Sequence, residues 1–175
     1  MTIAVDVRDL LGHPGSSREF RVEEPVEGLA TELVKVTEAA PVRVDLLLES
    51  VVEGILASGT VEGGWVVTCA RCLKPFDAEF RVGVRELFVP GAVPDDDDAY
   101  PVEDGSVDLE PLVRDTVIPA MPFAPLCRDD CRGLCPRCGG DRNLGECTCA
   151  EEVDPRWSAL GALIDVDLNR AVGEE

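Results

Sequence analysis

Six of the eight cysteines in this chain lie within the 23 residues 127–149. The other two, Cys69 and Cys72, form a separate close pair. Two thiols separated by two residues can both turn toward one point, where a soft tetrahedral cation can be held. In the segment Cys135–Gly139 the glycine can also take the positive φ that closes such a turn. The cysteine-rich segment has too few apolar residues to pack a core of its own, so we expect a metal ion to order it.

The eight cysteines are sufficient for two four-thiolate zinc sites. Structural zinc ions use four protein ligands, whereas catalytic zinc keeps one position open, and no His or carboxylate obviously completes an open site in this sequence. In a first arrangement, one site consists of Cys135, Cys138, Cys147 and Cys149, and a second site of Cys69, Cys72, Cys127 and Cys131. In the rival arrangement, Cys127, Cys131, Cys135 and Cys138 share one ion, and Cys69, Cys72, Cys147 and Cys149 share the other. The sequence does not choose between the two arrangements, and we expect one or two structural zinc ions as the cofactor.

Disulfides and thiol redox chemistry are the alternatives for these thiols. The amino terminus lacks a basic and apolar signal segment, so we expect a cytoplasmic protein with reduced thiols and no membrane span. Redox-active pairs usually lie at a helix N-terminus, whereas Cys69 and Cys72 follow a predicted strand and precede Pro75. The sequence also offers no nucleophile elbow and no phosphate-binding loop, and its only histidine, His13, lies in a Pro/Gly-rich loop. We therefore expect a protein that is not an enzyme.

Residues 42–89 alternate between apolar and polar side chains with a period of two, most clearly from Phe76 onward. This alternation is typical of half-buried strands, and Gly63-Gly64 is a hairpin signal between two of them. The even spacing predicts a curved or barrel-like antiparallel β-meander, to which residues 3–7 and 18–22 add edge strands. The expected fold class is α+β, with a few short helices and a cysteine-rich, zinc-bound C-terminal segment.

The composition divides the chain into three parts. Residues 1–90 are expected to form the antiparallel β-domain. Residues 91–107 are rich in Pro, Gly and Asp and include four consecutive aspartates, which predicts an acidic flexible linker. Residues 108–175 are expected to hold a helix with Asp108 as its N-cap, then the zinc knuckle, then a C-terminal helix that starts at Asp154 and packs back on the β-domain.

The net charge of the chain is −19. Affinity for RNA or DNA depends largely on basic side chains, so this charge disfavours a general nucleic-acid binder and favours a basic protein partner. Residues 127–149 are an exception, because four basic side chains there offset four acidic ones. Aromatic side chains for base stacking are missing from that segment. The candidates for direct RNA contact are Arg128, Arg132, Arg137 and Arg142.

Several motifs taken together resemble the YceD family, the large ribosomal RNA subunit accumulation proteins, in its branch with a cysteine-rich tail. These motifs are Pro14-Gly15-Ser16, Cys69-Ala-Arg-Cys72-Leu-Lys-Pro-Phe76, Val107-Asp108-Leu109, the segment from Cys127 to Gly139, and Asp154-Pro155-Arg156-Trp157. The resemblance implies a cytoplasmic, non-enzymatic factor needed for synthesis, processing or stability of 23S ribosomal RNA.

The family resemblance and the acidic charge together indicate the kind of partner. We expect a large-subunit ribosomal protein or a precursor particle, reached through protein contacts, and neither a membrane nor a small-molecule substrate. The alternative is direct contact between the zinc knuckle and ribosomal RNA.

Overall fold

The computed structural model describes residues 3–37, 41–91, 99–149 and 156. The chain divides into two compact units, Met1–Gly133 and Leu134–Glu175, which are taken in turn below. The expected C-terminal helix from Asp154 lies outside the described residues. Within the described ranges, no helix has the length and apolar character needed to cross a membrane.

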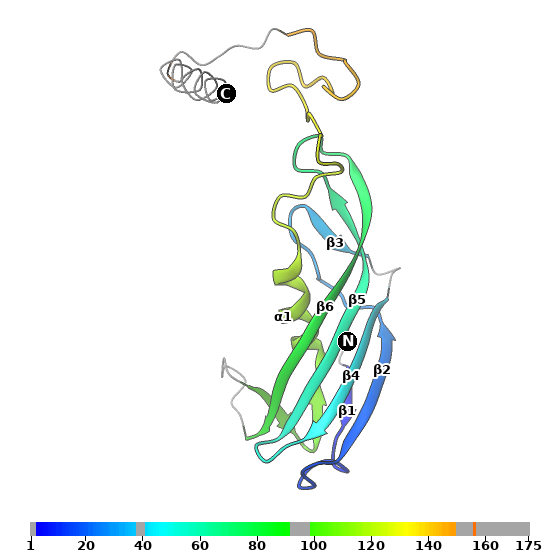
Figure 1. Ribbon diagram of the computed structural model, residues 1–175, viewed down its shortest axis with the longest axis vertical. Coiled ribbons are helices and arrows are strands. Elements are labelled where there is room, and N and C mark those ends of the chain that lie inside the picture. The colour runs from blue at the N-terminus through cyan, green and yellow to red at the C-terminus, as the bar shows by residue number, and fades with distance from the viewer. Residues whose placement is uncertain (1–2, 38–40, 92–98, 150–155, 157–175) are drawn as a thin grey trace, which may run out of the picture. The chain divides into compact units, whose positions relative to one another are not determined.

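The first unit is built on one curled, half-barrel sheet (Figure 1). Its strands are β1 (Ala4–Asp6), β2 (Ser17–Glu24), β3 (Val34–Val36), β4 (Val42–Ser50), β5 (Ile55–Thr68), β6 (Pro75–Pro90), β7 (Tyr100–Glu103) and β8 (Ser106–Asp108). They lie in the order β1-β8-β7-β6-β5-β4-β2, and β3 pairs with β5 outside this path. The predicted curved antiparallel sheet is confirmed, except that β6 and β7 run parallel. The described residues are mostly β and contain one α-helix, α1 (Leu109–Ala120).

Two long strands, β5 and β6, form the centre of this sheet. Apolar residues at alternate positions of β4 and β5 are buried, as the period-two pattern predicted. The helix α1 contacts β6, β5 and β1, and four of its side chains complete the core: Leu109, Leu112, Val113 and Val117. The predicted N-cap is also confirmed, since the Asp108 side chain accepts a hydrogen bond from the backbone N–H of Glu110 at 2.9 Å.

The hairpin expected at Gly63-Gly64 is wrong, because β5 continues through both glycines. Their partners on β6 give the physical reason. Gly63 lies opposite Phe80, and a Cβ on Gly63 would come within 2.9 Å of that ring. The missing side chain thus leaves room for Phe80, which stacks on Trp65 with 4.7 Å between ring centroids. Gly63 therefore accommodates an aromatic ring from the neighbouring strand, and neither glycine turns the chain.

A true hairpin lies inside the range expected to be a linker. Residues 100–103 and 106–108 form β7 and β8, joined by the turn Asp104-Gly105. Both turn residues have positive φ, 49° for Asp104 and 76° for Gly105, as a type I′ turn requires. Asp-Gly is a strong local hairpin signal, and the acidic composition around it had hidden that signal. The linker expected over 91–107 therefore does not extend through these two strands.

Candidate metal centres

The eight thiols form two groups of four, corresponding to the first of the two arrangements that the sequence allowed. We call Cys69, Cys72, Cys127 and Cys131 the hairpin cluster, and Cys135, Cys138, Cys147 and Cys149 the tail cluster. Within each cluster the Sγ atoms all lie within 4.8 Å of one another. The hairpin cluster belongs to the first unit and the tail cluster to the second.

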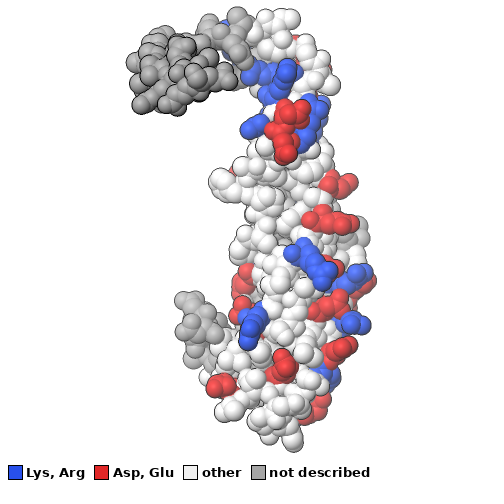
Figure 2. All heavy atoms as spheres, viewed as in Figure 1, with Lys and Arg blue, Asp and Glu red and all other residues white. Residues whose placement is uncertain are grey.

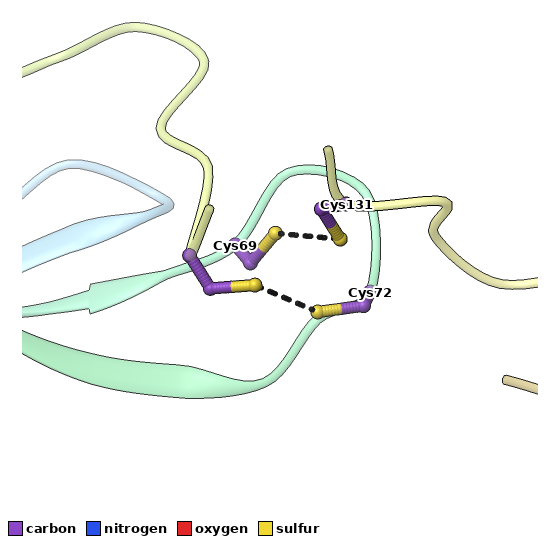
Figure 3. Close-up of side chains that lie close together, drawn as sticks. Cys69, Cys72 and Cys131 are labelled. Carbon is purple, nitrogen blue, oxygen red and sulfur yellow. Dashed lines mark hydrogen bonds between the residues drawn. The ribbon is translucent and has the colours of Figure 1, made fainter. Parts of the chain in front are cut away.

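The hairpin cluster joins two parts of the first unit that are distant in sequence. Cys69 and Cys72 lie in the tip that connects β5 to β6, whereas Cys127 and Cys131 follow α1. Figure 3 shows Cys69 and Cys72 at the hairpin tip and Cys131 on the second segment, with their sulfurs turned toward the space between the two segments. Three of its four thiols, those of Cys69, Cys72 and Cys131, are buried. The side chains of Phe76 and Leu126 pack against them.

The sulfur separations fit a tetrahedral zinc ion. The Sγ atoms of Cys69 and Cys131 are 3.8 Å apart, and those of Cys72 and Cys127 are 3.7 Å apart. Four Zn–S bonds of about 2.3 Å at tetrahedral angles place their sulfurs about 3.8 Å from one another. A disulfide would need about 2.05 Å, and all eight cysteines are free thiols. The donor set and spacing therefore suit a closed, structural metal site in which the protein supplies all four ligands.

The two clusters share one backbone framework at their first pair of cysteines. In the hairpin cluster, the N–H of Leu73 donates to the carbonyl of Cys69 at 2.9 Å, and the N–H of Cys69 donates to the carbonyl of Lys74 at 3.0 Å. The tail cluster repeats this pattern with the same spacing. There, Gly139 donates to Cys135 at 2.8 Å, and Cys135 donates to Gly140 at 2.9 Å.

Both turns need a residue with positive φ directly after the second cysteine. Gly139 has φ 72°, as predicted for the residue that closes the knuckle. Leu73 occupies the equivalent place with φ 58°, although a leucine pays a steric cost there. The same geometry is therefore formed twice in one chain, once with glycine and once with a mostly exposed leucine.

In each cluster, the first cysteine has a lowered pKa, which favours its thiolate form. Burial raises the pKa of Cys69, but backbone N–H groups of Cys127, Cys72 and Arg71 outweigh it and lower the pKa to about 6. Backbone N–H groups of Cys138 and Arg137 likewise lower the pKa of Cys135 to about 6.

The fourth thiol of the tail cluster, that of Cys149, has a raised pKa instead. Hydrogen bonding with Cys138 and Cys147 raises the pKa of Cys149 to about 12. Four thiols this close cannot all ionise without a cation among them. A metal ion would therefore displace protons as it binds, so metal affinity depends on pH.

Two residues that support the clusters were missed in the sequence. Arg71 lies between Cys69 and Cys72 and donates from its guanidinium to the carbonyl of Cys131 at 2.9 Å, which ties the hairpin tip to the second segment. Asp141, in the tail unit, is buried and accepts from both the backbone and the side chain of Asn143 at 2.8 Å. The Asp-x-Asn spacing is a recognisable signal for such a turn, whereas nothing local signals the role of Arg71.

The four arginines proposed for RNA contact are divided between the units. Arg128 and Arg132 belong to the first unit, and Arg128 pairs with Asp130 at 3.2 Å. Arg137 and Arg142 belong to the second unit. The structure thus provides two separate pairs of arginines, each beside one thiol cluster, and RNA contact by them stays a prediction.

Comparison with known proteins places the chain in a family. The family model described as "Large ribosomal RNA subunit accumulation protein YceD" matches residues 57–164. The uncharacterized protein Rv2926c of Mycobacterium tuberculosis is 36% identical, covering 98% of this chain and 86% of that protein. The protein YlbN of Bacillus subtilis is 28% identical, covering 89% of this chain and 94% of its own length.

A shorter match carries a functional name. A protein of Arabidopsis thaliana named "Large ribosomal RNA subunit accumulation protein YCED homolog 1, chloroplastic" is 32% identical over 65 residues, which is 37% of this chain and 20% of that protein. No solved structure matches the chain. The family model covers more than half of the sequence, including both thiol clusters, and the chain therefore belongs to the YceD family of large ribosomal RNA subunit accumulation proteins.

Proposed function

We propose that this protein is a non-enzymatic factor that supports 23S ribosomal RNA synthesis, processing or stability, and with it assembly of the large ribosomal subunit. Membership of the YceD family is the observation that carries this proposal. The printed name of the Arabidopsis relative, which refers to accumulation of large-subunit ribosomal RNA, supports it.

Protein contacts are the mode of action that the charge favours. A net charge of −19 repels RNA phosphates at long range and attracts basic proteins. Proteins of the large subunit must bind RNA and are commonly basic, so an acidic factor can shield such a protein or deliver it to a precursor particle. The partner in this proposal is a large-subunit ribosomal protein or such a particle.

Structural zinc is the second element of the proposal. The closed four-cysteine sets and their sulfur spacings support one ion in each cluster. An ion in the hairpin cluster would fasten the segment after α1 to the tip of the β5–β6 hairpin. An ion in the tail cluster would supply folding free energy to a unit with little apolar content. Metal analysis of protein purified without chelator tests this directly, and protein that holds no zinc and has eight freely reactive thiols would contradict it.

Affinity capture with and without nuclease tests the mode of action. Tagged protein from lysate should recover a large-subunit ribosomal protein or precursor particle, and nuclease treatment should leave a direct protein partner bound. Complete loss of ribosomal partners after nuclease would contradict protein contacts and favour RNA contact.

Direct RNA contact by the knuckle is the alternative, and one observation favours it. Phe123 is 97% exposed, which is unusual for a large apolar side chain. It lies four residues before Cys127 and two before Pro125, whose carbonyl accepts from Ala70 in the hairpin tip at 2.8 Å. An exposed aromatic ring five residues before Arg128 in the sequence could stack on an unpaired base. A gel shift with ribosomal RNA fragments at physiological salt tests the alternative, and absence of binding would reject it.

A further inference from the structure

The outer face of the sheet neutralises much of its own charge. Arg21 pairs with Asp45 at 2.7 Å, and this pair links neighbouring strands. Two further cross-strand pairs, Arg43–Glu23 at 2.7 Å and Arg81–Glu62 at 3.1 Å, continue the pattern. Figure 2 shows basic and acidic side chains interleaved along this part of the surface. A basic partner would have to break such pairs in order to bind there.

A groove at the other edge of the sheet has a different character. It has a volume of about 550 Å³ and is formed by β1, β7, β8 and the start of α1. Its apolar lining comes from Tyr100, Pro101, Val107 and Pro111. Tyr100 is fixed in place, because its ring packs on buried Phe88 at 5.2 Å between centroids and its hydroxyl donates to another groove residue, Asp115. The groove is thus preformed and partly apolar, as binding sites commonly are.

Four carboxylates surround this apolar lining, and one cation faces them. The carboxylates are Glu103, Asp104, Asp108 and Asp115, and the cation is Arg8. The guanidinium of Arg8 already has other partners, since it donates to the backbone carbonyl of Asp104 at 3.0 and 3.3 Å and pairs with Asp6 at 3.5 Å.

The carboxylate groups themselves have neutral partners. Asp108 caps α1, and Asp115 accepts from the hydroxyl of Tyr100 at 2.9 Å. Among the residues that the structure describes, no cationic side chain lies within ion-pair distance of any of the four carboxylates. Among the described residues, the groove therefore carries an excess of negative charge that no ion pair offsets, in contrast to the paired outer face.

We propose that this groove is the docking surface for a basic, Lys/Arg-rich segment of a protein partner. The stems of lysine or arginine side chains would cover Tyr100, Pro101 and Pro111, while their charged ends would meet Glu103 and Asp115. Charge complementarity of this kind sets specificity and association rate more than raw affinity, which suits a factor that must release its cargo. The inference rests on the proposed function, because that function requires a basic partner and the groove specifies where it binds.

The first test uses a fluorescein-labelled peptide of twelve alternating lysine and alanine residues, titrated with the full-length protein and followed by anisotropy. Binding should weaken steeply as salt rises, because the contacts are between exposed charges. The variant Glu103→Gln/Asp115→Asn keeps both side-chain shapes and removes two negative charges, and it should weaken binding about fivefold or more. The matched control Glu32→Gln/Glu53→Gln removes the same charge from two exposed positions outside the groove and should change binding less than twofold. Equal losses in both variants, or no binding by the wild-type protein, would overturn the groove assignment.

The second test separates the groove from the proposed function. Tagged wild-type protein and both double variants are compared by capture from lysate. Loss of the ribosomal partner in Glu103→Gln/Asp115→Asn alone supports docking in the groove. Retention of that partner by all three proteins overturns the groove but leaves the proposed function standing. Capture of no ribosomal partner by the wild-type protein overturns the proposed function, and the peptide titration then still decides whether the groove binds basic segments.

Discussion

Replacing one buried cysteine of the hairpin cluster should destabilise the first unit far more than the equivalent change in the tail cluster. Cys131 and Cys135 are matched for this comparison, since 1% and 3% of their surfaces are exposed. An ion in the hairpin cluster would cross-link Cys72 to Cys127 across 55 residues of chain. Closing a loop of that length stabilises a fold by about 4 kcal/mol in the chain-entropy description used for disulfides.

Thermal unfolding of the zinc-loaded protein, followed by the β-sheet circular dichroism signal, measures the difference. Cys131→Ala should lower the Tm of the first unit by about 10 °C, on the scale of a few degrees per kcal/mol for a unit of this size. Cys135→Ala should leave that Tm nearly unchanged while removing one zinc ion per chain.

Chelation gives an internal control for this comparison. Once the metal is removed, the free energies of unfolding of the wild-type protein and Cys131→Ala should differ by at most about 1 kcal/mol. This difference is the cost of the small cavity left by the thiol. Equal Tm shifts for the two alanine variants would refute the idea that the hairpin cluster fastens the sheet. An unchanged Tm for Cys131→Ala would refute it as well.

Three further predictions concern the first unit. Leu73→Gly should raise the free energy of unfolding by about 0.5–1 kcal/mol in urea titrations. Glycine adopts the positive φ without steric strain, and the change removes little buried surface. Gly59→Ala should lower it by about 2–4 kcal/mol, since the new Cβ would lie 2.0 Å from the carbonyl oxygen of Asp45, and an unperturbed Tm would contradict this packing. The hydrogen bond from Arg114 lowers the pKa of Glu110. Their pair therefore stabilises the fold at pH values above the ordinary carboxyl pKa, and this stabilisation is lost as the pH falls through the lowered pKa of Glu110. Arg114→Gln should therefore cost about 0.5 kcal/mol more at about pH 7 than at about pH 3, and a cost independent of pH would contradict the assignment.

The sequence predicted those features that depend on neighbouring residues. Alternation over residues 42–89 indicated the sheet, Asp108 indicated the start of α1, and Gly139 indicated the closing turn of a knuckle. Each of these signals is local, because the alternation of side chains, helix capping and the need for positive φ can be recognised within a few residues.

The features that were missed depend on residues far apart in the chain. Gly63-Gly64 resembles a turn until Phe80 from the next strand is placed over it. The grouping of the thiols depends on how the β5–β6 hairpin and α1 bring Cys69 close to Cys131, 62 residues later. The Asp104-Gly105 hairpin is the exception, because it is a local signal that the acidic composition obscured.

The long sequence separation within the hairpin cluster also affects the order of events during synthesis. Cys69 and Cys72 leave the ribosome early, at the tip of a hairpin whose two strands can already pair. Cys131 follows 62 residues after Cys69, once the rest of the sheet and α1 have been made. Domains tend to fold from the N-terminus as the chain emerges. An ion that needs all four thiols would therefore enter a sheet that has already formed, and its arrival would mark the moment at which the first unit is complete.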